Sequence, residues 1–108
     1  MFIAMNRFRI GLGKEDEFAR IWKERETNLP EVPGFIAFHL LRGPSDEQCT
    51  LFASHTVWAS RGHFEAWTRS DAFRRAHGGA GQSAGLYLGP PQFEGFEVIQ
   101  AIDGRPAD

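Results

Sequence analysis

The sequence lacks the features that mark several large classes of protein. Its one cysteine, Cys49, excludes an intramolecular disulfide and provides no spacing for a thiolate metal site. No strongly basic run is present and the formal charge is −2, whereas a nucleic-acid partner requires a concentrated basic surface. The apolar N-terminal stretch has no positive region before it and is too short for a signal peptide or a membrane span. We therefore expect a cytoplasmic protein with neither a membrane nor a nucleic-acid partner.

Aromatic residues, by contrast, are abundant. Ten Phe and three Trp contribute to an aromatic content of 13% in a chain of 108 residues. A chain of this length has room for a single domain, residues 1–108, which buries roughly two-thirds of the surface that its unfolded form exposes. So many rings in one small domain indicate a densely packed core, a dimer interface or a pocket lined by flat side chains.

The spacing of apolar residues predicts six regular elements. Strands are expected at residues 2–10, 35–42, 48–58 and 93–101. Helices are expected at 14–26 and 61–77, the second with Ser60 as its N-cap and Gly78-Gly79 at its end. The glycine- and proline-rich stretch 78–92 is expected to be a flexible loop, and 102–108 a frayed tail.

The order β-α-β-β-α-β is that of the ferredoxin-like α+β fold, an antiparallel sheet with both helices on one face. Strand 35–42 is apolar on both faces, so we expect both of its faces to be covered. The helices leave the other face of the sheet open, and a second copy of the chain would cover it. The sequence therefore predicts a homodimer built by packing of two sheet faces.

Asn6 fits poorly in a purely structural strand. It lies on the face that also carries Phe2, Ala4 and Phe8, and a buried amide costs free energy unless it is hydrogen-bonded. A nearby backbone group could satisfy the amide, so the position alone leaves a structural role and a functional role open.

His77 and Trp67 are two further candidates in the region of the second predicted helix. His77 immediately precedes the Gly-Gly helix end, where an imidazole could ligate haem iron or could simply interact with the helix dipole. On one continuous helix, Trp67 and His77 would point about 80° apart and lie roughly 15 Å apart along the axis, close to the width of a porphyrin. The alternative for Trp67 is core packing beside Phe64.

Two segments of the sequence form a recognisable pattern. One is the first strand, Phe2-Ile-Ala-Met-Asn6-Arg7. The other begins at Thr56-Val-Trp-Ala-Ser60 and runs on through Phe64, Trp67, Ser70-Asp71, Phe73 and Ala76-His77. In these segments the sequence resembles the haem-degrading monooxygenases of the Isd type, within the antibiotic biosynthesis monooxygenase superfamily of dimeric α+β barrels. The resemblance extends over the whole chain in the order of its elements and is sharp over about a third of it.

The resemblance implies a set of roles at one haem site. His77 would ligate the iron, Asn6 would lie over the distal face of the haem, Trp67 would help to buckle the porphyrin, and Phe64 would join them in binding it. The implied reaction uses O2 and opens the ring of the bound haem, which is both substrate and cofactor. The electrons would come from an external donor such as a reductase.

Three other readings remain open at the level of sequence. Other members of the superfamily oxidise quinols or aromatic polyketides without a metal or a cofactor, and such a protein would not need His77. The chain could also bind haem as a carrier without degrading it, or could be a dimeric domain without catalytic activity. A test of haem binding distinguishes a cofactor-independent monooxygenase from a haem-degrading one. A test of haem turnover distinguishes a haem carrier from a haem-degrading enzyme.

Overall fold

The computed structural model describes residues 1–25, 28–76 and 85–105. Its strands are β1 (Phe2–Gly11), β2 (Phe35–Ser45), β3 (Cys49–Trp58) and β4 (Gln92–Glu97). Its helices are α1 (Glu15–Glu24), α2 (Arg61–Thr68) and α3 (Asp71–Ala76), with a short 3-10 helix, η1 (Leu29–Glu31), between α1 and β2.

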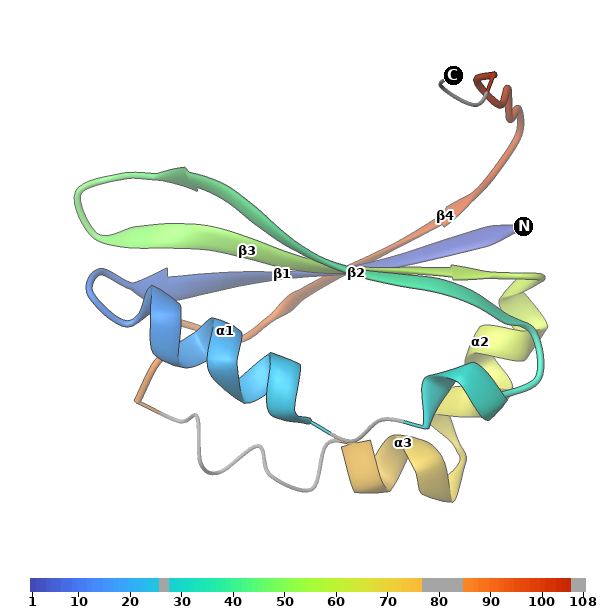
Figure 1. The fold of residues 1–108 in the computed structure, drawn as a ribbon, viewed down its shortest axis with the longest axis horizontal. Coiled ribbons are helices and arrows are strands. Elements are labelled where there is room, and N and C mark those ends of the chain that lie inside the picture. The colour runs from blue at the N-terminus through green and yellow to red at the C-terminus, as the bar shows by residue number, and fades with distance from the viewer. Residues whose placement is uncertain (26–27, 77–84, 106–108) are drawn as a thin grey trace.

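The described strands form one antiparallel sheet in the order β2-β3-β1-β4. All helices lie on the same side of this sheet, with α1 below one end and α2 and α3 below the other (Figure 1). This arrangement confirms the predicted ferredoxin-like α+β fold. The described chain contains no helix that is both long and apolar enough to cross a membrane.

The core lies between the helices and the covered face of the sheet. One cluster contains Phe2, Trp58 and Trp67, and a second contains Phe8, Phe18 and Phe52. Phe18 and Trp58 have no exposed surface, and full burial of such a side chain stabilises the fold by about 1.5–3 kcal/mol. The abundant rings therefore build two aromatic clusters, one at each end of the covered face.

The prediction of a single helix over 61–77 is wrong, because the helix breaks between Thr68 and Asp71. The Ser70 hydroxyl donates a hydrogen bond to the carbonyl of Trp67 at 2.6 Å and accepts one from the backbone N–H of Phe73 at 3.2 Å. Ser70 thus ends α2 and begins α3. The angle and separation expected for Trp67 and His77 on one helix no longer apply, and residue 77 itself lies outside the described residues.

The other boundaries differ by a few residues for local reasons. The predicted strand 93–101 ends at Glu97, which pairs with Phe2, the first residue of β1, and one more backbone hydrogen bond follows, from Val98 to the Met1 carbonyl at 2.9 Å. The predicted helix 14–26 stops at Glu24, and Arg25 is already extended. In the hairpin, the first strand runs to Ser45 and the second starts at Cys49. Residues 78–84 of the predicted loop 78–92 lie outside the described residues.

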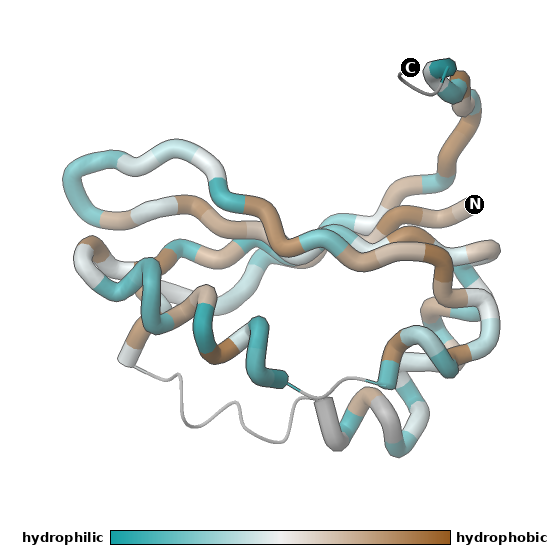
Figure 2. The backbone as a smooth tube through the Cα atoms, in the orientation of Figure 1, coloured by the Kyte–Doolittle hydropathy of each residue, from teal (hydrophilic) through white to brown (hydrophobic). Residues whose placement is uncertain are grey.

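The sheet face opposite the helices is uncovered in the single chain, so the expectation that both faces of β2 are covered stays a prediction that depends on the homodimer. Leu41 on β2 and Phe96 on β4 lie on this open face with 41% and 45% of their surface exposed. Hydrophobic residues recur along the middle of the strands, whereas the β2–β3 turn is hydrophilic (Figure 2). Exposed apolar surface of this kind is typical of interaction sites.

We expect the protein to be a homodimer at micromolar concentration, because a second copy would remove this open face from water. Light scattering should give the mass of two chains. Phe96→Asp should shift the equilibrium towards the monomer, because a charge on the open face opposes burial. Leu12→Asp, which changes an exposed residue in the turn after β1, is the control and should remain dimeric. A monomeric wild-type chain would refute this assembly.

Candidate active site

A cavity of about 660 Å³ lies between the covered face of the sheet and the helices. The sheet contributes mainly apolar side chains from every strand, namely Ala4, Asn6, Phe8, Phe38, Ser54, Thr56 and Phe93. The helical side and its connections contribute Trp22, Arg25, Leu29, Phe64, Trp67, Thr68 and Phe73, and a later segment adds Tyr87, Gly89 and Pro91. Its volume and aromatic walls are those of a site for a small molecule or cofactor.

Asn6 lies on the floor of this cavity. Its strand β1 alternates so that Ala4, Asn6 and Phe8 share the covered face, as the sequence predicts. Within the described residues, no backbone or side-chain group hydrogen-bonds to the Asn6 amide. The structural alternative considered from the sequence, an amide satisfied by a neighbouring backbone group, is therefore not what the described residues show. The amide remains available to a ligand.

Ser54 is a second polar group on the floor that sequence reasoning missed. Asn6 and Ser54 are direct partners in the β1–β3 ladder, and both line the cavity. Thr56, the next residue on the same face, already has hydrogen-bond partners within the protein. Its hydroxyl accepts from Trp58 Nε1 at 2.9 Å and donates to the Ala4 carbonyl at 3.3 Å. Ser54 lies beside Asn6 because β1 pairs with β3 in this register. The amino-acid sequence of neither strand alone predicts the register.

Trp67 both packs in the core and lines the cavity. Its indole packs in the core, with its ring centre 5.3 Å from that of Trp58 and 4.8 Å from that of Phe73, and only 9% of its surface is exposed. It also lines the cavity, as does Phe64, whose ring stacks on Phe93 at 5.6 Å. Trp67 and Phe64 therefore form a rigid aromatic wall at the α2 end of the cavity.

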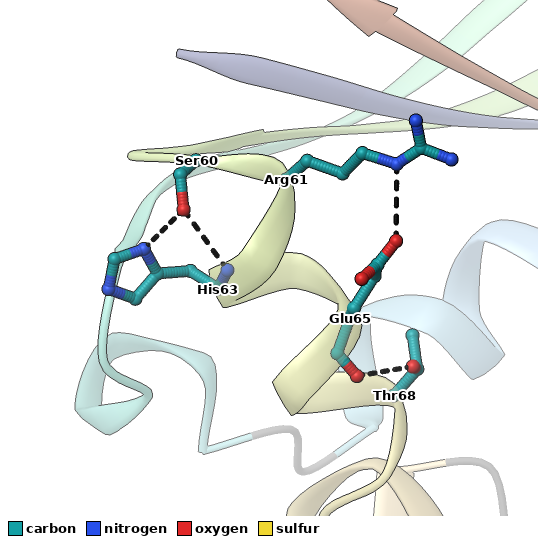
Figure 3. Close-up of polar contacts among 5 residues, drawn as sticks. All are labelled: Ser60, Arg61, His63, Glu65 and Thr68. Atoms are coloured by element: carbon teal, nitrogen blue, oxygen red, sulfur yellow. Dashed lines mark hydrogen bonds and ion pairs between the residues drawn. The ribbon is translucent and has the colours of Figure 1, made fainter.

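Polar contacts within and before α2, the helix that carries Phe64 and Trp67, stabilise its first turns (Figure 3). Ser60 caps the helix as predicted, with its hydroxyl accepting from the backbone N–H of His63 at 3.2 Å and contacting the His63 ring nitrogen Nδ1 at 2.7 Å. Further along, Arg61 pairs with Glu65, and the Thr68 hydroxyl donates to the Glu65 carbonyl. The His63 ring also lies against Gly34, which has a φ of +83° and no space for a Cβ atom. His63 therefore has a structural place in the first turn of α2, against the Ser60 cap and Gly34.

The opposite wall is formed by α1. Trp22 stacks on Phe38 with the ring centres 5.9 Å apart, and the Arg25 guanidinium lies 4.3 Å above the Trp22 ring centre. Among the described residues that line the cavity, Arg25 is the charged one. It follows the last residue of α1, so the end of that helix places a cation at the cavity wall.

Among the described residues, two carboxyl groups have clearly shifted pKa values, and neither of them lines the cavity. Hydrogen bonds from its own backbone N–H and then from the Thr50 hydroxyl, at 3.0 Å, lower the pKa of Glu15 at the start of α1. The backbone N–H groups of Gln48 and Cys49 lower the pKa of Asp46 in the β2–β3 turn. These groups stabilise local structure.

The histidines of the described residues lie away from the cavity. His39 and His55 face each other on the open side of the sheet with their Nδ1 atoms 3.4 Å apart, and His63 contacts Ser60, the N-cap residue of α2. The residues that the structure describes contain no group of three or more His, Cys, Asp and Glu side chains placed to hold a metal ion. His77 directly follows α3, whose Phe73 lines the cavity, but it lies outside the described residues.

Comparison with known proteins agrees with this fold. Residues 1–79 match the model of the antibiotic biosynthesis monooxygenase family. A haem-degrading monooxygenase of Shouchella clausii is 31% identical over 101 residues, which are 93% of this chain and 94% of the relative.

Two solved structures are also similar. A mutant of MhuD with two manganese protoporphyrin IX molecules per active site has a TM-score of 0.76 and 25% identity, over 96% of this chain and 100% of the other. The monooxygenase ActVA-Orf6 of Streptomyces coelicolor in complex with nanaomycin D has a TM-score of 0.73 and 19% identity, over 96% and 92% of the two chains. The similarity to ActVA-Orf6 shows a shared fold and nothing further. On the match to its family model, this chain belongs to the antibiotic biosynthesis monooxygenase family.

Proposed function

We propose that this protein is a haem-degrading monooxygenase, which binds haem and, with O2 and an external electron donor, opens the porphyrin ring and releases iron. The observation that carries the proposal is the aromatic cavity with the Asn6 amide on its floor and Trp67 in its wall. The relative in Shouchella clausii, named for haem degradation, and the porphyrin complex of MhuD support it.

Each of the candidate residues has a distinct task in this proposal. Trp67 and Phe64 hold the flat macrocycle from the α2 side, and their packing keeps them from moving aside when it binds. The Asn6 amide donates a hydrogen bond towards the reacting oxygen from the floor of the cavity. His77 ligates the iron and fixes its electronic properties. Bound haem supplies the iron that activates O2.

The proposal predicts two spectroscopic events. Haemin added to the protein should produce a saturable Soret band at one site or more per chain. Ascorbate in the presence of catalase should then bleach that band and release iron that a ferrous chelator captures. A Soret band that persists with a competent reductant would show that the protein carries haem without degrading it.

A cofactor-independent monooxygenase that oxidises a quinol or an aromatic polyketide is the second candidate. The floor of the cavity favours it in one respect, because Asn6 and Ser54 can hydrogen-bond an aromatic hydroxyl without a metal. O2-dependent oxidation of a hydroquinone by haem-free protein, together with no saturable Soret band, would establish this activity in place of haem degradation.

A further inference from the structure

A pair of histidines lies on the open face of the sheet, away from the cavity. His39 on β2 and His55 on β3 are direct partners in the antiparallel ladder, so their side chains project from the same face. Their Nδ1 atoms are 3.4 Å apart, and the ring centres are 5.5 Å apart. The two strands therefore hold two imidazoles against each other, and the haem reaction proposed above uses neither ring.

The contact between the two Nδ1 atoms requires a proton or an ion between them. An Nδ1 atom that carries a hydrogen donates, whereas one without a hydrogen offers a lone pair, so two bare nitrogens facing each other repel. A metal ion can take the place of the shared proton, because both rings then direct a lone pair at it. Neutral imidazole is the commonest metal ligand among protein side chains. The pair is thus arranged to share either a proton or a metal ion.

The separation of the two nitrogens matches one metal geometry. Imidazole nitrogens bind Zn²⁺ at about 2.0–2.1 Å in tetrahedral sites, which places two such nitrogens about 3.3–3.4 Å apart. The observed separation of 3.4 Å agrees with this value. A square-planar site, as Cu²⁺ and Ni²⁺ prefer, would bring neighbouring nitrogens to about 2.8–3.0 Å at the same bond lengths. The arrangement of the pair therefore favours tetrahedral Zn²⁺.

Apolar residues flank the pair along both strands. On this face, the neighbouring rungs of the ladder pair Ala37 with Val57 and Leu41 with Ala53. Within the described part of the chain, no third His, Cys, Asp or Glu is placed to complete a metal site with the two rings. The second copy expected on this face would remove the ring nitrogens from water, and buried polar groups cost free energy unless they are satisfied. An ion bound between the rings satisfies them.

We propose that His39 and His55 are the ligands that each chain contributes to a Zn²⁺ site on the open face of the sheet. The two Nδ1 atoms fill two positions of a tetrahedral shell, and water or a donor of the second copy fills the other two. The ion takes the place of the proton between the rings. Because the site lies on the opposite side of the sheet from the cavity, it does not depend on haem binding.

The test is a Zn²⁺ titration of the full chain, free of haem and of any affinity tag, read by competition with a chromophoric chelator. The wild type should bind Zn²⁺ saturably, at no more than one ion per chain. Co²⁺ should occupy the same site and give the visible absorption bands of a tetrahedral complex, which added Zn²⁺ should abolish. His39→Gln and His55→Gln each leave one imidazole, so each should lose the saturable Zn²⁺ binding and the Co²⁺ bands.

His63→Gln is the matched control, because it removes a histidine that lies beside the Ser60 cap of α2, away from the pair. It should bind Zn²⁺ with wild-type affinity, and circular dichroism verifies that each variant is folded. Wild-type Zn²⁺ affinity in either His39→Gln or His55→Gln overturns the site. A wild-type chain without saturable Zn²⁺ binding overturns it too, as does an equal loss of binding in His63→Gln.

Discussion

Replacing His77 by Ala is expected to abolish haem degradation and to weaken haem binding strongly, without unfolding the protein. An imidazole is the usual protein ligand of haem iron. None of the histidines at 39, 55 and 63 lines the cavity, so the described chain offers no replacement ligand close to the site. The loss should appear as a shifted and weakened Soret band and as no bleaching with ascorbate.

Two controls separate ligation from folding in the His77→Ala protein. His39→Gln removes a histidine from the open sheet face and should retain the wild-type spectrum. Added imidazole should restore part of the Soret spectrum of His77→Ala, because a small ligand can occupy the space of the missing ring. If His77→Ala keeps both the spectrum and the turnover of the wild type, a different residue ligates the iron.

The order of elements was predictable because the apolar spacing is local. The alternation from Phe2 to Ile10 places its members on the covered face, where four of the five are buried. The break at Ser70 was missed for a physical reason. Apolar residues continue at helical spacing through Phe64, Trp67 and Phe73, but a Ser followed by Asp also favours a new helix start. In the structure, the side-chain hydrogen bonds of Ser70 decide between the two.

The composition of the site was predictable only in part. Asn6 was visible as a polar residue on an apolar strand face, and Trp67 as part of a motif. Ser54 reaches the cavity through pairing of β3 with β1, and Arg25 through the end of α1, so both depend on contacts between segments distant in sequence. Such contacts leave no local pattern.

The structure also changes how Trp67 should be tested. Because the indole packs against Trp58 and Phe73, Trp67→Ala would remove a buried core side chain, a change that commonly costs about 3–5 kcal/mol. A slow Trp67→Ala enzyme would therefore reflect lost stability as well as lost contact with the porphyrin. Trp67→Phe keeps most of the packing and is the more informative substitution.

Asn6→Ala is expected to slow haem degradation by about a hundredfold, the usual effect of one preorganised donor, worth about 3 kcal/mol. Haemin affinity should change little, because Asn6 ligates nothing and its hydrogen bond is needed most in the reacting complex. A loss of this kind lowers the rate rather than the binding. The measurement is single-turnover decay of the Soret band with ascorbate and catalase, alongside a haemin titration of the same protein.

Ser54→Ala is the matched comparison, since Ser54 lies directly opposite Asn6 in the β1–β3 ladder and lines the same floor. If general polarity of the floor controls the rate, both substitutions should slow the reaction equally. If the directed amide donor controls it, Asn6→Ala alone should lose most of the activity. Asn6→Ala with an unchanged rate would leave haem degradation standing but would remove Asn6 from the mechanism. The amide of Asn6 has no hydrogen bond within the described protein, which is the reason to expect that it acts on the substrate.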